Sequence, residues 1–106
     1  MTHRQEKLTS LYTDLISTFI LRLRLQKNLV TVTGVELSKD SKYAKIFISI
    51  YPEGKEKEAL KILQGNRQKV REFIGSKTSM KFLPRFDFEI DKGEKNRQKI
   101  EELLAR

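Results

Sequence analysis

The side chains best suited to chemistry in this sequence are lysines and arginines gathered in one stretch. From Asn66 to Arg85 there are six of them and one acid, Glu72, so the local net charge is six minus one, or +5. A smaller basic group surrounds a predicted turn. Such side chains contact phosphates, and neighbouring amides add hydrogen-bond donors. The candidate binding residues are therefore Asn66, Arg67, Gln68, Lys69, Arg71, Lys77, Lys81, Arg85, Lys39, Lys42 and Lys45.

The groups that catalysis requires are almost absent. His3 is the single imidazole, there is no cysteine, and no pair of histidines offers a metal site. The five glycines form neither GxGxxG nor GxxxxGK[ST], the loops that cradle phosphates in nucleotide-binding enzymes. The sequence therefore predicts a binding protein rather than an enzyme, with no cofactor, no metal and no small-molecule substrate.

Composition agrees with a small basic binding domain. The chain has 106 residues, 22 lysines and arginines, 14 acids and a formal net charge of +8. This length predicts one domain, residues 1–106. Basic domains of this size typically bind nucleic acid or another anionic surface, although solubility alone is the alternative explanation of the charge. The sequence lacks a run of about 18 apolar residues, which a membrane-spanning helix would need. No apolar leader is visible either, so we expect a cytoplasmic protein.

The first half of the chain predicts a helix followed by a β-hairpin. Apolar residues recur at helical spacing from Leu8 to Leu23, and the helix is expected to end near 26–28. The strand 29–37 changes its alternation at Thr33-Gly34, which predicts a β-bulge. The return strand alternates strictly, and we expect its isoleucine row to face the core and its aromatic row to lie half exposed. The aromatic row consists of Tyr43, Phe47 and Tyr51.

The second half predicts an interrupted helix, a strand and a short closing helix. Residues 55–77 have helical spacing except at Gly65, Asn66, Arg67 and Gln68, where a kink or a helix–turn–helix joint is expected. Phe86, Phe88 and Ile90 alternate as in a strand, and Ile100, Leu103 and Leu104 follow at helical spacing. Helices covering one face of three strands predict a two-layer α+β domain.

Several segments together resemble the ribosome-binding factor A family. The hairpin VTVTGVELSKDSKYAKIFISI matches the family's V-T-[VIF]-[TS]-x-V-E-[VL]-S-x-D segment and its A-K-[VI]-[YF]-[VI]-S strand. LKIL and VREFIG flank the kink, KFLPRFDFEID follows, and KIEELL ends the chain, in the family's order. The resemblance implies a KH-like domain of the type II topology, α-β-β-(kinked α-α)-β, with a three-stranded sheet.

Two family features are missing. The family's Ala-x-Gly kink falls on Asn66, Arg67 and Gln68, where neither the alanine nor the glycine is present, and Gly65 lies one residue earlier. The Asp-Pro-Arg segment before the first strand is replaced by LRLQKNLV. The GXXG loop with which KH modules clamp a nucleic-acid backbone is also absent, as it is in the family.

The resemblance implies a non-enzymatic assembly factor. Members bind the immature small (30S) ribosomal subunit, contact its 16S rRNA and support late maturation and rRNA processing, notably in the cold. We therefore expect a monomeric 30S-binding protein. Two alternatives remain: a general KH-type module for single-stranded RNA or DNA, and a protein-interaction domain whose charge serves solubility alone.

Overall fold

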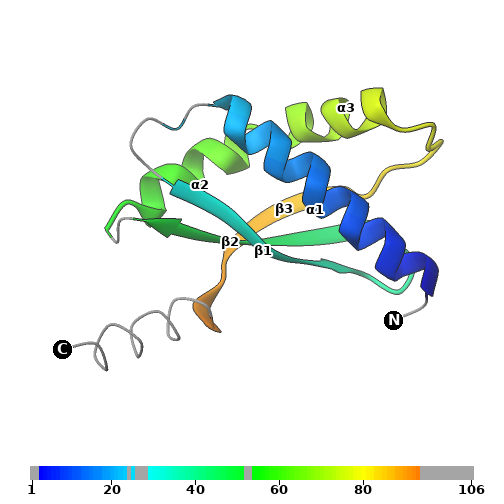
Figure 1. Cartoon of the computed structure of the whole chain (residues 1–106), viewed down its shortest axis with the longest axis horizontal. Coiled ribbons are helices and arrows are strands. Elements are labelled where there is room, and N and C mark those ends of the chain that lie inside the picture. The colour runs from blue at the N-terminus through cyan, green and yellow to red at the C-terminus, as the bar shows by residue number, and fades with distance from the viewer. Residues whose placement is uncertain (1–2, 24, 26–28, 52–53, 94–106) are drawn as a thin grey trace.

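A computed structural model of the chain describes residues 3–23, 25, 29–51 and 54–93. The elements are, in order, α1 (His3–Leu23), β1 (Leu29–Leu37), β2 (Tyr43–Tyr51), α2 (Glu56–Gly65), α3 (Arg67–Lys77) and β3 (Arg85–Ile90). The helices lie on one side of the sheet (Figure 1), so the predicted two-layer α+β architecture is confirmed. The predicted stop of the first helix at 26–28 and the closing helix with Ile100, Leu103 and Leu104 lie outside the described residues.

The sheet combines a hairpin with a crossover. Its strand order is β1-β2-β3, with β1 antiparallel and β3 parallel to β2. A parallel neighbour requires a long connection, which α2 and α3 provide. The register between β1 and β2 shifts between Val32, which pairs with Ile48, and Gly34, which pairs with Phe47. The predicted bulge at Thr33-Gly34 is therefore present.

The core lies between the sheet and the helices. Ala44, Ile46, Ile48 and Ile50 of β2 are buried, as their alternation predicts. Burying one such aliphatic side chain stabilises the fold by about 1.5–3 kcal/mol. The helices and β3 contribute further buried apolar side chains, namely Tyr12, Ile16, Ile20, Ala59, Leu63, Val70, Ile74, Phe86 and Phe88.

The other face of β2 is turned away from the helices. Tyr51 keeps 66% of its surface exposed and Tyr43 keeps 36%, while Phe47 is half-buried. The aromatic row is thus outside the core, and the isoleucine row inside it, as predicted.

Asn66 connects α2 and α3, the two halves of the interrupted helix. Its backbone N–H donates to the carbonyl of Leu63 at 3.0 Å, and its own carbonyl accepts from the N–H of Val70 at 2.9 Å. Its side-chain amide also donates to the carbonyl of Ile62 at 2.7 Å. Asn66 therefore satisfies a carbonyl at the end of α2 while starting α3, and the interruption predicted at residues 65–68 is confirmed.

Candidate nucleic-acid interface

A hollow of about 610 Å³ lies at the joint between α2 and α3, and we call it the joint groove. Four of its lining side chains are cations and none is an acid. They come from the hairpin turn, from α3 and from the start of β3. The lining residues are Lys42, Gln64, Gly65, Arg67, Gln68, Arg71, Leu83, Arg85 and Phe86.

Tertiary contacts bring these cations together. Arg67 and Arg71 are four residues apart on α3, so they share one face of the helix. The N–H of Arg85 donates to the carbonyl of Lys42 at 2.9 Å, which attaches the hairpin turn to the start of β3. Arg71 Nη2 donates to the carbonyl of Leu83 at 3.3 Å. Five predicted binding residues, Lys42, Arg67, Gln68, Arg71 and Arg85, therefore line one groove.

Arg67 lies beside an acid at the edge of the joint groove. Its Nε donates to the carbonyl of Gln64 at 3.0 Å, and its Nη1 lies 3.7 Å from Asp87 Oδ1. Partial burial alone would raise the pKa of the Asp87 carboxyl. Hydrogen bonds from Tyr43 and Gln64, together with the charge of Arg67, outweigh that effect and lower this pKa. Asp87 is therefore an ionised partner that helps to hold Arg67 in place.

Three predicted lysines point elsewhere. Lys69 is exposed on α3 but is not among the residues that line the joint groove, since it is two positions from Arg67 and from Arg71. The Nζ of Lys77 lies 5.7 Å from the ring centroid of Phe73. Lys45 Nζ lies 3.2 Å from Glu89 Oε2 on the outer face of the sheet. A role for these lysines in binding stays a prediction.

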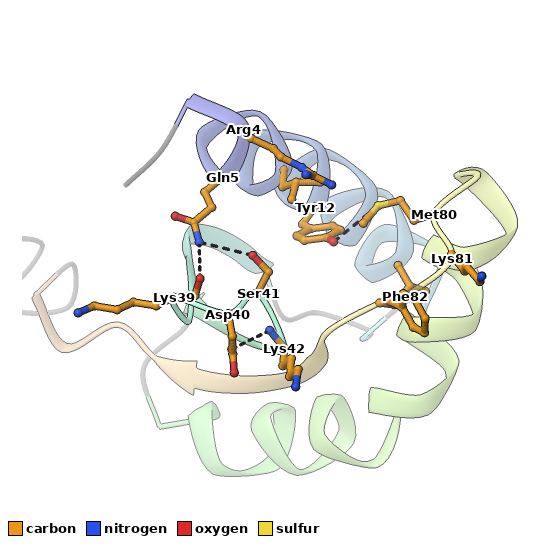
Figure 2. Close-up of a pocket in the computed structure, with 12 residues that line it drawn as sticks. Arg4, Gln5, Tyr12, Lys39, Asp40, Ser41, Lys42, Met80, Lys81 and Phe82 are labelled. Carbon is orange, nitrogen blue, oxygen red and sulfur yellow. Dashed lines mark hydrogen bonds between the residues drawn. The ribbon is translucent and has the colours of Figure 1, made fainter.

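A second hollow, of about 1160 Å³, gathers the remaining predicted lysines; we call it the α1 hollow. It lies between α1, the hairpin turn and the segment 80–83 (Figure 2). Lys39, Lys42 and Lys81 line it, together with Arg4 and Phe82, which are not among the binding residues predicted from the sequence. The sequence carries no periodic signal for either, because their position depends on how α1 packs against the hairpin turn.

The described part of the chain offers neither a metal site nor a membrane span. Among the described residues, no group of three or more histidine, cysteine or acidic side chains lies close enough to hold a metal ion. No helix among them is long and apolar enough to cross a bilayer.

Comparison with known proteins settles the family. The family model described as "Ribosome-binding factor A" matches residues 4–104. The chain belongs to the ribosome-binding factor A family. Members of this family are ribosome-binding factors and not enzymes, in agreement with the prediction from the sequence.

Curated ribosome-binding factor A proteins resemble the chain over most of its length. The protein from Moorella thermoacetica is 39% identical over 84 residues, which cover 78% of this chain and 69% of that protein. The protein from Dictyoglomus thermophilum is 34% identical over 112 residues, covering 97% of this chain and 92% of that protein. The resemblance therefore includes the hairpin, the joint and β3.

Solved structures of ribosome-binding factor A proteins share the fold. The solution NMR structure of a Thermotoga maritima candidate for this family is 34% identical, with a TM-score of 0.73 over 83% of this chain and 87% of that one. A homology model of the Thermus thermophilus protein, fitted into a cryo-EM map of its complex with the 30S subunit, has a TM-score of 0.64 at 22% identity. That similarity covers 88% of this chain and 97% of that one.

Proposed function

We propose that this chain binds the immature 30S ribosomal subunit through its 16S rRNA and assists late assembly and rRNA processing. It acts as a monomer in the cytoplasm and performs no chemistry. The joint groove carries the proposal, because Lys42, Arg67, Arg71 and Arg85 come from three separate segments and line one hollow without an acid among its lining residues. The Thermus thermophilus relative described with the 30S subunit has the same fold, which supports the choice of partner.

Phosphate contacts explain how a domain without catalytic groups recognises rRNA. Each phosphate that a cation neutralises releases counterions, so affinity falls as salt rises. Four such contacts predict a slope of about −3 in a plot of log affinity against log salt. Gln68, which also lines the joint groove, adds a donor that carries no charge.

The test compares two double variants with the same loss of charge. Arg67→Gln with Arg71→Gln removes two cations from the joint groove, whereas Lys57→Gln with Lys61→Gln removes two exposed cations, also four residues apart, from α2 outside the groove. We expect the first pair to weaken binding to purified immature 30S subunits at least tenfold and to reduce the salt slope by about 2. The second pair is expected to change affinity much less. Equal effects of the two pairs would show that the joint groove is not the binding site.

A general KH-type module for single-stranded RNA or DNA is the alternative. Such a module binds short oligonucleotides as tightly as its natural target, whereas an assembly factor prefers the folded subunit. A filter-binding comparison of short RNA and DNA oligonucleotides with intact 30S subunits distinguishes the two. Migration with free 30S subunits, but not with complete ribosomes, on a sucrose gradient of cell lysate supports the assembly role.

A further inference from the structure

The α1 hollow has an apolar floor. Leu8 and Tyr12 come from α1, and Met80 and Leu83 come from the segment before β3. Tyr12 is 1% exposed, and its hydroxyl donates to the sulfur of Met80 at 3.7 Å. A floor of this kind accepts a flat apolar ring. The volume of about 1160 Å³ exceeds the roughly 300–1,000 Å³ of typical ligand pockets, so the hollow has room for a nucleotide.

An exposed aromatic ring lies among the lining residues of the α1 hollow. Phe82 keeps 80% of its surface exposed, although burial of such a ring is strongly favourable. The Nζ of Lys81 lies 5.8 Å from the ring centroid. An exposed ring beside a cation has the two parts of a single-strand binding surface, which are a plane for a base and a charge for its phosphate.

The lining of the α1 hollow is strongly basic. Arg4, Lys39, Lys42 and Lys81 face a single acid, Asp40, so four minus one leaves +3. Asp40 is held in the hairpin turn, where its carboxylate accepts from Ser38 Oγ at 2.6 Å and from the N–H of Lys42 at 3.1 Å. The occupant that fits an apolar floor and cationic surroundings is flat and anionic.

We propose that the α1 hollow receives one unstacked nucleotide of a single-stranded RNA segment, whose base stacks on Phe82 and whose phosphates contact the surrounding cations. This inference rests on the proposed function and adds a base-binding pocket to it. Lys42 and Leu83 line both the α1 hollow and the joint groove. A strand whose phosphates follow the joint groove therefore passes directly to the α1 hollow.

The hairpin side of the α1 hollow is fixed before any ligand binds. Gln5 Nε2 reaches from α1 to the turn, where it lies within hydrogen-bond distance of the carbonyl of Ser38 at 3.3 Å. Figure 2 shows its two other contacts, with the carbonyl of Lys39 and with Ser41 Oγ, both at 3.4 Å. Ser41 adopts a left-handed conformation with φ of 58°, which closes the turn. A pocket formed in advance loses less entropy when a ligand orders in it.

The first experiment reports directly on stacking. The chain has no tryptophan, so Phe82→Trp carries a single tryptophan whose emission can be followed apart from that of the three tyrosines. Leu21→Trp is the matched control, because Leu21 is 78% exposed on α1 and does not line the α1 hollow. Each variant is titrated at low salt with a ten-residue uridine RNA and with an abasic strand of the same length. We expect the uridine RNA to quench Phe82→Trp and the abasic strand not to. Neither strand is expected to quench Leu21→Trp.

The second experiment uses immature 30S subunits and separates this inference from the proposed function. Phe82→Ala is expected to weaken binding about tenfold, whereas Leu21→Ala leaves it unchanged. Normal 30S binding by Phe82→Ala without quenching of Phe82→Trp overturns the base pocket and leaves the proposed function standing. Quenching in a protein that does not bind 30S subunits supports the pocket and overturns the function. Weaker 30S binding by Phe82→Ala without quenching assigns Phe82 to a protein contact and also overturns the pocket.

Discussion

The hydroxyl of Tyr43 on β2 donates a hydrogen bond of 2.9 Å to Oδ2 of Asp87 on β3. The other oxygen of the same carboxylate lies 3.7 Å from Nη1 of Arg67, the first residue of α3. A single carboxylate therefore links the outer face of the sheet to the joint groove. It also places one negative charge beside a cation that the proposed function assigns to phosphate binding.

Replacement of Asp87 by asparagine is expected to change the pH dependence of the free energy of unfolding. The pKa of Asp87 is lower in the folded chain than in the unfolded chain, so its ionised form stabilises the fold above about pH 4, and this contribution is lost as pH falls through the folded-state pKa. The side chain is 33% exposed, so solvent screens the effect to at most about 1 kcal/mol. Urea unfolding at pH 7 and at pH 2.5 measures it.

The expected result is that Asp87→Asn is less stable than the native chain at pH 7 and equal to it at pH 2.5. Asp14→Asn on the exposed face of α1 is the control, because it makes the same chemical change. Among the ion pairs of the described residues, none includes Asp14. A stability difference that persists unchanged at pH 2.5 would show that Asp87 acts through shape rather than charge.

The same substitution is expected to strengthen binding to 30S subunits. Loss of the negative charge frees Arg67 for phosphate and raises the local positive potential, and we expect affinity to rise two- to fivefold at low salt and less at high salt. Glu89→Gln is the control, because it removes one acid from the same strand but next to Lys45 rather than Arg67. An equal gain from both variants would mean that only net charge matters.

Periodicity and composition predict the layers of this fold, because those depend on side chains close together in the sequence. The isoleucine row of β2 is buried where alternation places it, and the change of alternation at Thr33-Gly34 locates a real bulge. The joint follows from the polar interruption around Asn66. The detail of the joint does not follow from the sequence, since the hydrogen bond that the side-chain amide of Asn66 donates to the carbonyl of Ile62 is one of several that this residue type can make.

The candidate site is only partly predictable, because it depends on contacts between distant segments. The density of basic residues points to Arg67 and Arg71, but it does not distinguish these groove-lining residues from Lys69. That distinction requires knowing which face of α3 borders the joint groove. Lys45 belongs to the same basic group in the sequence, yet it pairs with Glu89 on the outer face. Phe82 carries no periodic signal in the sequence, and its 80% exposure becomes known only from the packing of the segment 80–83.

Two glycines are expected to respond oppositely to alanine. Gly54 has φ of +92°, where an L-residue is strained, so Gly54→Ala is expected to lower the free energy of unfolding by about 1 kcal/mol. Gly65 at the end of α2 lacks a positive φ, and a Cβ added there meets no atom within 4 Å. Gly65→Ala is therefore expected to raise the free energy of unfolding by about 0.5–1 kcal/mol. Chemical denaturation measures both, and a destabilised Gly65→Ala would mean that the joint does need glycine.

A hydrogen bond across the outer face of the sheet is expected to contribute to stability. Thr33 in the bulge donates from Oγ1 to Asp91 Oδ2 at 2.6 Å, and the N–H of Asp91 donates to the carbonyl of Ile48 at 2.8 Å. Asp91 thus bonds β2 through its backbone and reaches β1 through its side chain. The bulge aims Thr33 at this carboxylate, which joins parts of the chain 58 residues apart.

A double-mutant cycle of Thr33→Val and Asp91→Ala is expected to give a coupling free energy of about 1 kcal/mol. Ser38 and Asp40 provide the comparison, because Ser38 Oγ donates to Asp40 Oδ1 at the same 2.6 Å, but the pair is exposed and only two residues apart. Water competes for that bond, and breaking it separates no strands, so the coupling of Ser38→Ala with Asp40→Ala is expected to be at most about half as large. If urea unfolding gives equal couplings, the bond across the sheet contributes no more than a local turn contact, and the bulge has no role in holding β1 to the end of β3.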